Sequence, residues 1–222
     1  MKNVKGLVLI ITILTFSVSV FAQKNIAEAT IVYNLAIQSA NNSPQKGDAF
    51  DGASTTVYLK GNNSRTDMVS PLGKEVTIYN SKSNNAVILK EFSGQKLMIT
   101  LSRENWKAKN KMYSDTKFEL TSEYKAIGGY NTRKAIAKKE DGKTFEVYYA
   151  TDMLPANKEY DPTFSNLPGL AIEYEIESGK MKFKYTLSKI SFEAVQVSLF
   201  DFPNSGYRTM SYEENQKLKK GN

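Results

Sequence analysis

The sequence predicts an all-β protein with a few short helices, built around one antiparallel sheet that curls. Apolar and polar residues alternate with a period of two from residue 27 almost to residue 202, and this alternation is typical of strands with one buried face. Short clusters of glycine, asparagine and serine separate the alternating segments, as expected at tight turns. Helical periodicity is scarce, so long helices are not expected to cover the sheet.

The first 22 residues read as a cleavable secretory signal peptide. Lys2 and Lys5 precede an apolar stretch over residues 7–16, and small residues precede a cleavage position after Ala22. An uncleaved anchor would need about 20 apolar residues to cross a bilayer, and this stretch is shorter. We therefore expect a mature chain of residues 23–222 without a transmembrane segment, in the periplasm or secreted.

Length and composition favour one domain that needs no disulfides. Removing 22 of the 222 residues leaves 200, enough for a sizeable core. There is no cysteine, which excludes a disulfide framework, thiolate chemistry and a lipid anchor on an N-terminal cysteine. The formal net charge of +7 becomes +5 without the two signal lysines, and the basic residues are spread along the chain. We expect no nucleic-acid partner, because scattered lysines usually form solvated faces.

Twelve strands are expected in an up-and-down order. Turns between them are predicted at Gly61-Asn62-Asn63, Asn84-Asn85, Ser93-Gly94, Asp141-Gly142 and Ser178-Gly179. The strands are expected at residues 27–39, 53–60, 65–69, 75–80, 86–91, 96–102, 117–124, 132–139, 144–151, 170–177, 180–192 and 194–202.

Two short helices are expected. The polar, lysine-rich stretch over residues 103–113 carries the only tryptophan, Trp106. At the other end, Ser211 and Glu214 form a capping box, and lysines follow where a helix C-terminus favours positive charge. The second helix is therefore expected at about residues 211–220.

The clearest hairpin lies at residues 170–187, where apolar and charged residues alternate strictly. With Ser178-Gly179 as its loop, Glu175 is expected opposite Lys182 on a charged face. The other face is apolar and extends onto the neighbouring hairpin at Asp141-Gly142, where Ile136 is expected opposite Val147. As candidate ligand-binding residues we assign the apolar row Val147, Tyr149, Leu170, Ile172, Tyr174, Ile176, Met181, Phe183, Tyr185 and Leu187.

A family resemblance is carried by three segments in the second half of the chain. They read AIGGYNTRKAIAKKEDGKTFEVYYATDM (126–153), FSNLPGLAIEYE (164–175) and FPNSGYRTM (202–210). They resemble exported bacterial families of unknown function related to LolA-like lipoprotein carriers, and the LPGL stretch is similar to the GLPGLI family.

This resemblance implies a LolA-like open half-barrel whose concave apolar face accepts acyl chains. The chain departs from those carriers in lacking an evident N-terminal helix and lid helices. In physical terms, the paired Gly128-Gly129 allows positive φ before a strand, and Pro168-Gly169 forms the turn that begins the next strand.

Enzymatic chemistry is not expected. The chain has no histidine, which removes the usual neutral-pH base and zinc ligand. Carboxylate-only catalysis would depend on residues such as Asp152, Glu159, Asp161 and Glu173, but their sequence spacing does not pair them. No catalytic residue, metal site or cofactor is assigned.

Two functions remain open. The first is a non-enzymatic carrier or binder of a hydrophobic ligand, such as a lipid or a lipoprotein acyl chain, in a concave apolar groove. The second is a structural or interaction protein of the cell envelope or secretion machinery with an ordinary packed core. A cavity of several hundred Å³ lined by apolar residues would favour the first, and a filled interior would favour the second.

Overall fold

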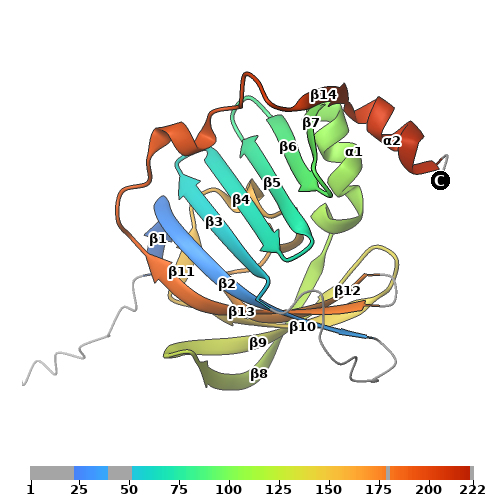
Figure 1. Cartoon of the computed structure of the whole chain (residues 1–222). Coiled ribbons are helices and arrows are strands. Elements are labelled where there is room, and N and C mark those ends of the chain that lie inside the picture. The colour runs from blue at the N-terminus through green and yellow to red at the C-terminus, as the bar shows by residue number, and fades with distance from the viewer. Residues whose placement is uncertain (1–22, 40–51, 179–180, 221–222) are drawn as a thin grey trace, which may run out of the picture.

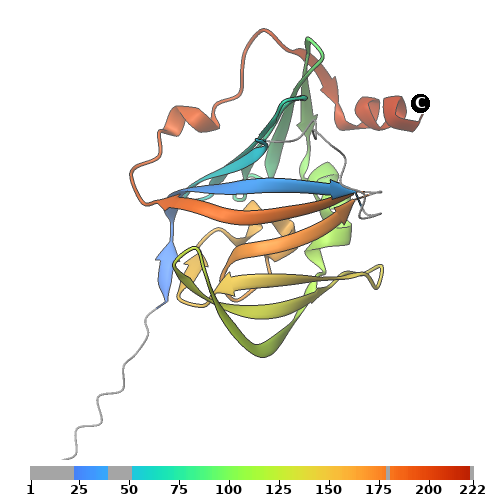
Figure 2. The ribbon, with the colours of Figure 1, turned by 60° about the horizontal axis from the view of Figure 1, so that its bottom comes forward.

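The structure, a computed structural model, describes residues 23–39, 52–178 and 181–220. The expected signal peptide therefore lies outside the described residues. One curved twelve-stranded sheet dominates the fold, and a small two-stranded sheet accompanies it (Figure 1). Among the described residues, β14 (Arg208–Ser211) and β8 (Lys117–Ile127) form the two edges of the large sheet and lie at opposite ends of the molecule (Figure 2). The predicted fold class, a β-rich protein with short helices and an open, curved sheet, is confirmed.

The strands of the large sheet form two groups in chain order, β2 to β7 and β8 to β13, and β14 is added beside β7. Their order in the large sheet is β14-β7-β6-β5-β4-β3-β2-β13-β12-β10-β9-β8. The two groups meet at β2, which pairs with β3 on one side and with the late strand β13 on the other. The strands are β2 (Glu28–Ser39), β3 (Ser54–Lys60), β4 (Asn63–Ser70), β5 (Gly73–Asn80), β6 (Asn85–Phe92), β7 (Gln95–Leu101), β8 (Lys117–Ile127), β9 (Tyr130–Lys138), β10 (Thr144–Ala150), β12 (Leu170–Ser178), β13 (Met181–Ser191) and β14 (Arg208–Ser211).

Two pairings are parallel, which the up-and-down prediction did not include. β14 runs parallel to β7 at one sheet edge. β1 (Lys24–Ile26) runs parallel to β11 (Met153–Pro155) in the small sheet. In both cases a short strand from near one end of the described chain is added to a strand from its interior.

The register gives the sheet one continuous inner face. Tyr33 pairs with Thr55 on one side and with Leu187 on the other, and Thr55 pairs with Met68 in the next strand. Directly paired residues point to the same side of a sheet, so this face extends across β2, β3, β4 and β13. Burial confirms it, because Tyr33, Val57 and Leu187 are all buried.

Short helices cover parts of both faces. On the inner face lie α1 (Arg103–Ser114), seen beside β6 and β7 in Figure 1, and two 3₁₀ turns, η1 (Lys158–Tyr160) and η2 (Pro162–Phe164). The outer face of β5 and β6 is covered by the segment that contains η3 (Val197–Phe200). The strand predicted at 194–202 is therefore wrong.

The physical reason for this error is visible in β6. Four consecutive residues of β6, from Ala86 to Leu89, are buried, so both of its faces need a cover. Val195 and Phe200 supply that cover against Val87 and Leu89. Apolar residues that cover the second face of a sheet can lie in irregular backbone. In the sequence they alternate with polar residues as they would in a strand, so the pattern does not distinguish the two.

Two predicted hairpin registers are wrong. Glu175 lies opposite Lys184 and Glu177 opposite Lys182, two positions away from the predicted pairing. A shift of two keeps every side chain on its predicted face. At Asp141 the loop is longer than predicted: Lys139 N–H donates to the carbonyl of Lys143 at 2.9 Å.

That longer loop shifts the register between β9 and β10 by one residue from the predicted one. Val147 lies opposite Ala135, and Ile136 lies opposite Glu146. Ala135 and Ala137 therefore fill the core, and Ile136 is only half-buried. Because a shift of one exchanges the two faces, the predicted pair Ile136 and Val147 does not form.

Both predicted helices are present. α1 begins after Ser102, whose hydroxyl accepts from the Asn105 amide at 3.2 Å. α2 (Tyr212–Lys220) begins with the predicted capping box: Glu214 N–H donates to the Ser211 hydroxyl at 3.2 Å, and Ser211 N–H donates to the Glu214 carboxylate at 2.7 Å. No helix in the described ranges is both long enough and apolar enough to span a bilayer.

Gly169 of the LPGL stretch has a packing role. A β-carbon at this position would lie 2.1 Å from the carbonyl oxygen of Ala150 and 2.7 Å from the ring of Tyr149. Glycine therefore lets β12 begin against the end of β10. Gly128 and Gly129 adopt positive φ, as predicted.

Candidate functional site

The predicted apolar row divides into a packed inner part and a half-buried outer part. The inner six are buried: Val147, Tyr149, Leu170, Ile172, Tyr174 and Leu187. The outer four are half-buried: Ile176, Met181, Phe183 and Tyr185. Six of the ten are thus buried in the core, and ligand contact by the row stays a prediction.

The inner part is closed by the η1–η2 segment. The ring of Phe164 meets the ring of Tyr174 edge-on, with 4.6 Å between their centroids, and also lies 6.3 Å from the rings of Phe118 and Phe145. Leu167, which follows η2, is 1% exposed. Phe164 and Leu167 occupy the space that a ligand would need above the inner row.

A small polar cavity of about 40 Å³ remains beneath Phe164. Tyr33, Thr55 and Asp161 are among the residues that line it. The Thr55 hydroxyl has no hydrogen-bond partner among the described residues, and the Tyr33 hydroxyl donates to the carbonyl of Ala171 at 2.8 Å. This volume has room for a few water molecules and none for an acyl chain.

Burial dominates the electrostatics of this cavity. It raises the pKa of the Asp161 carboxyl above its ordinary value, although the Thr163 amide donates to that carboxyl at 2.9 Å. Burial also raises the pKa of the Tyr33 and Tyr174 phenols, and that of Tyr185 to about 12. The tyrosines therefore remain neutral donors at ordinary pH.

A larger cleft lies beside α1. Trp106, 7% exposed, stacks on Tyr79 of β5 with ring centroids 4.4 Å apart. Asn110, one turn later, is buried and donates its side-chain N–H to the carbonyl of Trp106 at 2.9 Å. The stack of Trp106 on Tyr79 holds α1 over the inner face of β5 to β7, and a cleft remains between the helix and the η1–η2 segment.

This α1 cleft has a volume of about 560 Å³ and mainly apolar walls. Pockets of about 300–1,000 Å³ with aromatic walls and a few polar groups are typical of small-molecule sites. None of the ten predicted site residues lines it. Its lining comes from β5, the β5–β6 turn, α1 and the η1–η2 segment, and consists of Tyr79, Asn84, Trp106, Lys107, Ala108, Asn110, Lys111, Ser114, Glu159, Pro162 and Ser165.

Charged groups stand at the rim of the α1 cleft. The Tyr79 hydroxyl donates to the Glu159 carboxylate at 2.7 Å, and burial together with this bond raises the pKa of the Tyr79 phenol. Lys107 and Lys111 lie one turn apart on α1, and both are exposed. The cleft thus combines an apolar interior with two cations and one carboxylate at its edge.

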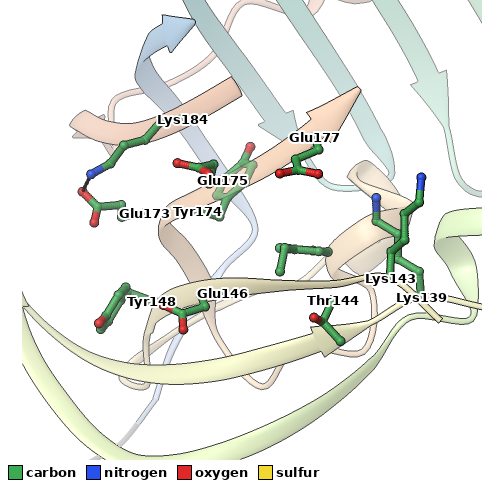
Figure 3. Close-up of a pocket in the computed structure, with 11 residues that line it drawn as sticks. Lys139, Lys143, Thr144, Glu146, Tyr148, Glu173, Tyr174, Glu175, Glu177 and Lys184 are labelled. Carbon is green, nitrogen blue, oxygen red and sulfur yellow. Dashed lines mark ion pairs between the residues drawn. The ribbon is translucent and has the colours of Figure 1, made fainter. Parts of the chain in front are cut away.

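A third opening lies where the sheet divides. β10 and β12 pair only from Val147–Tyr174 to Ala150–Leu170, with a bulge after Tyr148. Beyond Val147 and Tyr174 they separate, and a cleft of about 520 Å³ lies between them. Figure 3 shows glutamates of β12 on one side and residues of β10 on the other. We call this opening the fork.

The four carboxylates considered for catalysis do not form a common site. Asp161 lines the small cavity, Glu159 stands at the α1 cleft, and Glu173 pairs with Lys184 at 3.2 Å in the fork. Asp152 is exposed, and its carbonyl accepts from the Lys24 amide. Across the described ranges, no group of three acidic side chains is placed to hold a metal ion.

Comparisons with known proteins give a family and distant structural likenesses. A profile of DUF4412, described as a domain of unknown function, matches residues 45–161. No curated protein sequence matches the chain. Among solved structures, PNGF-II aligns with a TM-score of 0.49 and 16% identity over 86% of this chain and 32% of PNGF-II.

MucB aligns more weakly. Its crystal structure gives a TM-score of 0.35 and 10% identity over 80% of this chain and 57% of MucB. The Pseudomonas aeruginosa MucA/MucB complex gives a TM-score of 0.33 and 7% identity, covering 79% of this chain and 56% of the matched one. The chain spans about a third of PNGF-II and just over half of MucB.

Proposed function

Because the chain belongs to the DUF4412 family, whose description names no activity, we propose its function from its clefts: it binds an amphipathic lipid-like molecule in the α1 cleft. The observation that carries this proposal is the cleft of about 560 Å³ with mainly apolar walls beside Trp106. The sequence resemblance to carriers of acyl chains agrees with it, although the site moves from the apolar row to α1.

The charges at the rim indicate the chemistry of the head group. An acyl tail would lie against Trp106, Ala108 and Pro162, where apolar burial contributes about 25 cal/mol per Å². An anionic head would then meet Lys107 and Lys111, whose long stems can also cover apolar surface. A free fatty acid has both features, so we propose it as the simplest ligand of this class.

The role is that of a non-enzymatic carrier or binder, and we propose that it acts in the periplasm or after secretion. The location depends on the predicted signal peptide. The intact mass of the exported protein tests that prediction. A mass that still includes residues 1–22 would contradict it.

The single tryptophan makes binding directly measurable. Trp106 is the only tryptophan in the chain and lines the α1 cleft, so palmitate should change its fluorescence and displace a fluorescent fatty acid. Absence of both signals would overturn the proposal. Gently purified protein should also yield extractable lipid.

Matched variants locate the site. Ala108→Phe narrows the cleft from an exposed helix position, so it should weaken palmitate binding at least tenfold. Ala194→Phe is the control, because Ala194 is exposed on the segment before η3. Equal affinity of Ala108→Phe and wild type would exclude the α1 cleft.

Charge variants test the head group. Lys107→Glu with Lys111→Glu should weaken palmitate and leave a neutral long-chain alcohol unaffected. Lys189→Glu is the control, because it reverses the charge of an exposed lysine on β13 that does not line the cleft. If palmitate affinity is the same in all three proteins, the proposed head-group contact is wrong.

A further inference from the structure

The fork leaves two backbone edges facing each other inside the sheet. β10 keeps its pairing with β9 as far as Thr144, and β12 keeps its pairing with β13 as far as Ser178. Between β10 and β12, however, pairing ends at Val147 and Tyr174. Residues 144–146 and 175–177 therefore have a strand neighbour on one side only among the described residues.

Such edges are sites where another strand can add. Unpaired N–H and C=O groups of an edge strand are templates for backbone pairing, and many proteins recognise extended peptides in this way. Here two edges flank one cleft of about 520 Å³. A strand that entered it could pair with both sides (Figure 3).

The two faces of the fork differ in chemistry. Tyr174 and Phe145 line it from the inner face, and both contact the ring of Phe164. Ile176, on the same face as Tyr174, is half-buried against the core. An inserted strand would need apolar side chains on this side.

Negative charge follows the outer face on the β12 side. Glu175 and Glu177 are 43% and 62% exposed, and they share a single cation, Lys182, at 3.5 Å and 3.4 Å. Glu173 forms an ion pair with Lys184 at 3.2 Å. This rim has three carboxylates for two lysines.

The β10 side repeats this excess. Glu146, 59% exposed, shares Lys134 with Glu123. Lys139 and Lys143 also line the fork, and Lys139 lies over the ring of Phe145 on the inner side, 5.5 Å from its centroid. The carboxylates on both rims of the outer face therefore exceed the cations that pair with them.

We propose that the fork is a binding site for an extended peptide segment in which basic and apolar residues alternate. Such a segment would add as a strand between β10 and β12, with its apolar residues towards Tyr174 and its basic residues towards Glu146, Glu175 and Glu177. Period-two side-chain direction matches both faces at once. The partner is a polypeptide, which sets this site apart from the lipid site at α1.

The test uses the mature protein and a fluorescently labelled peptide of about eight residues that alternates lysine and valine. Fluorescence anisotropy should show saturable binding that weakens as salt is raised, because the charges are exposed. A peptide of equal composition in two blocks, valines then lysines, should bind at least tenfold more weakly. Equal binding of the two peptides, or none, would overturn the proposal.

Backbone pairing is tested separately from charge. The alternating peptide with an N-methyl group at every backbone amide keeps its charges but loses the backbone donors of both edges, so it should lose binding. Amide signals of residues 144–147 and 174–177 should shift only with the unmethylated peptide. If the methylated peptide binds as well, charge attraction alone explains the binding and the strand model is wrong.

Protein variants locate the contact. Glu175→Gln with Glu177→Gln should weaken the peptide about three- to tenfold, because each of the two lost charge pairs is exposed and contributes modestly. Glu119→Gln, at an exposed position of β8 outside the fork, should have no effect. Equal affinity of the double variant and wild type would place the peptide elsewhere.

Discussion

Phe164→Ala is the sharpest test of how the inner face is closed. Phe164 is 6% exposed and belongs to the main core cluster. Replacing a buried phenylalanine by alanine typically costs about 3–5 kcal/mol. We expect the upper part of this range, because the ring also loses its edge-on contact with Tyr174, and such aromatic pairs contribute about 0.5–1.5 kcal/mol.

Phe183→Ala provides the comparison. Phe183 belongs to the same predicted row but is half-buried, in a small cluster with Leu35 and Met68. Because the Phe183 side chain buries less apolar area, we expect Phe183→Ala to cost about half as much free energy of unfolding as Phe164→Ala. The ratio of the two losses in free energy of unfolding is more reliable than either loss alone, because both substitutions remove the same atoms.

Thermal unfolding followed by circular dichroism measures both variants. For a chain of this length, about 2–4 °C of melting temperature corresponds to 1 kcal/mol, so Phe164→Ala should lower the midpoint by roughly 6–20 °C. A Phe164→Ala protein as stable as wild type would show that η2 is a removable lid. The inner row would then again be a candidate groove.

Four further outcomes are expected. Gly169→Ala should destabilise by about 1–3 kcal/mol in denaturant unfolding, because its β-carbon would meet a backbone carbonyl. Because the pKa of Asp161 is raised in the folded state, the stability of wild type should fall as pH rises from about 3.9, the ordinary pKa of this carboxyl in the unfolded chain. Asp161→Asn should remove this dependence of stability on pH. The same dependence in the variant and in wild type would contradict the prediction. Glu175→Lys and Lys182→Glu should show a coupling of roughly 0.2–1 kcal/mol in a double-mutant cycle, whereas strict additivity would mean that the ion pair does not form in solution. Ser211→Ala should cost about 1 kcal/mol of local stability in α2, visible as faster amide exchange there.

Side-chain faces were predictable from the sequence, and strand registers were less so. Alternation placed Tyr174, Ile176 and Phe183 on one face, because a period of two does not depend on the partner strand. Register depends on the loop instead. The loop after Glu177 pairs this residue with Lys182 rather than Lys180, and no pattern of apolar residues distinguishes these two registers.

The α1 cleft could not be found from local patterns. It brings together Tyr79, Trp106 and Glu159, which are far apart in sequence and belong to a strand, a helix and a 3₁₀ turn. The one usable signal was a lone tryptophan in an otherwise polar helix. A large aromatic residue in such a helix is expected to be buried against a neighbouring element, but the sequence does not say which one.

The position of β2 has a consequence for how the chain folds. β2 can pair with β3 as soon as both have been synthesised, but its other edge pairs with β13, for example Val32 with Lys189. Contacts this distant in sequence close late and slow folding. Until they close, β2 presents an open edge that invites pairing between chains. The second edge of β2, in the first third of the chain, is thus covered only when β13, in the last third, pairs with it. Pulse-labelled amide exchange should therefore show the amides of β2 gaining protection together with those of β13.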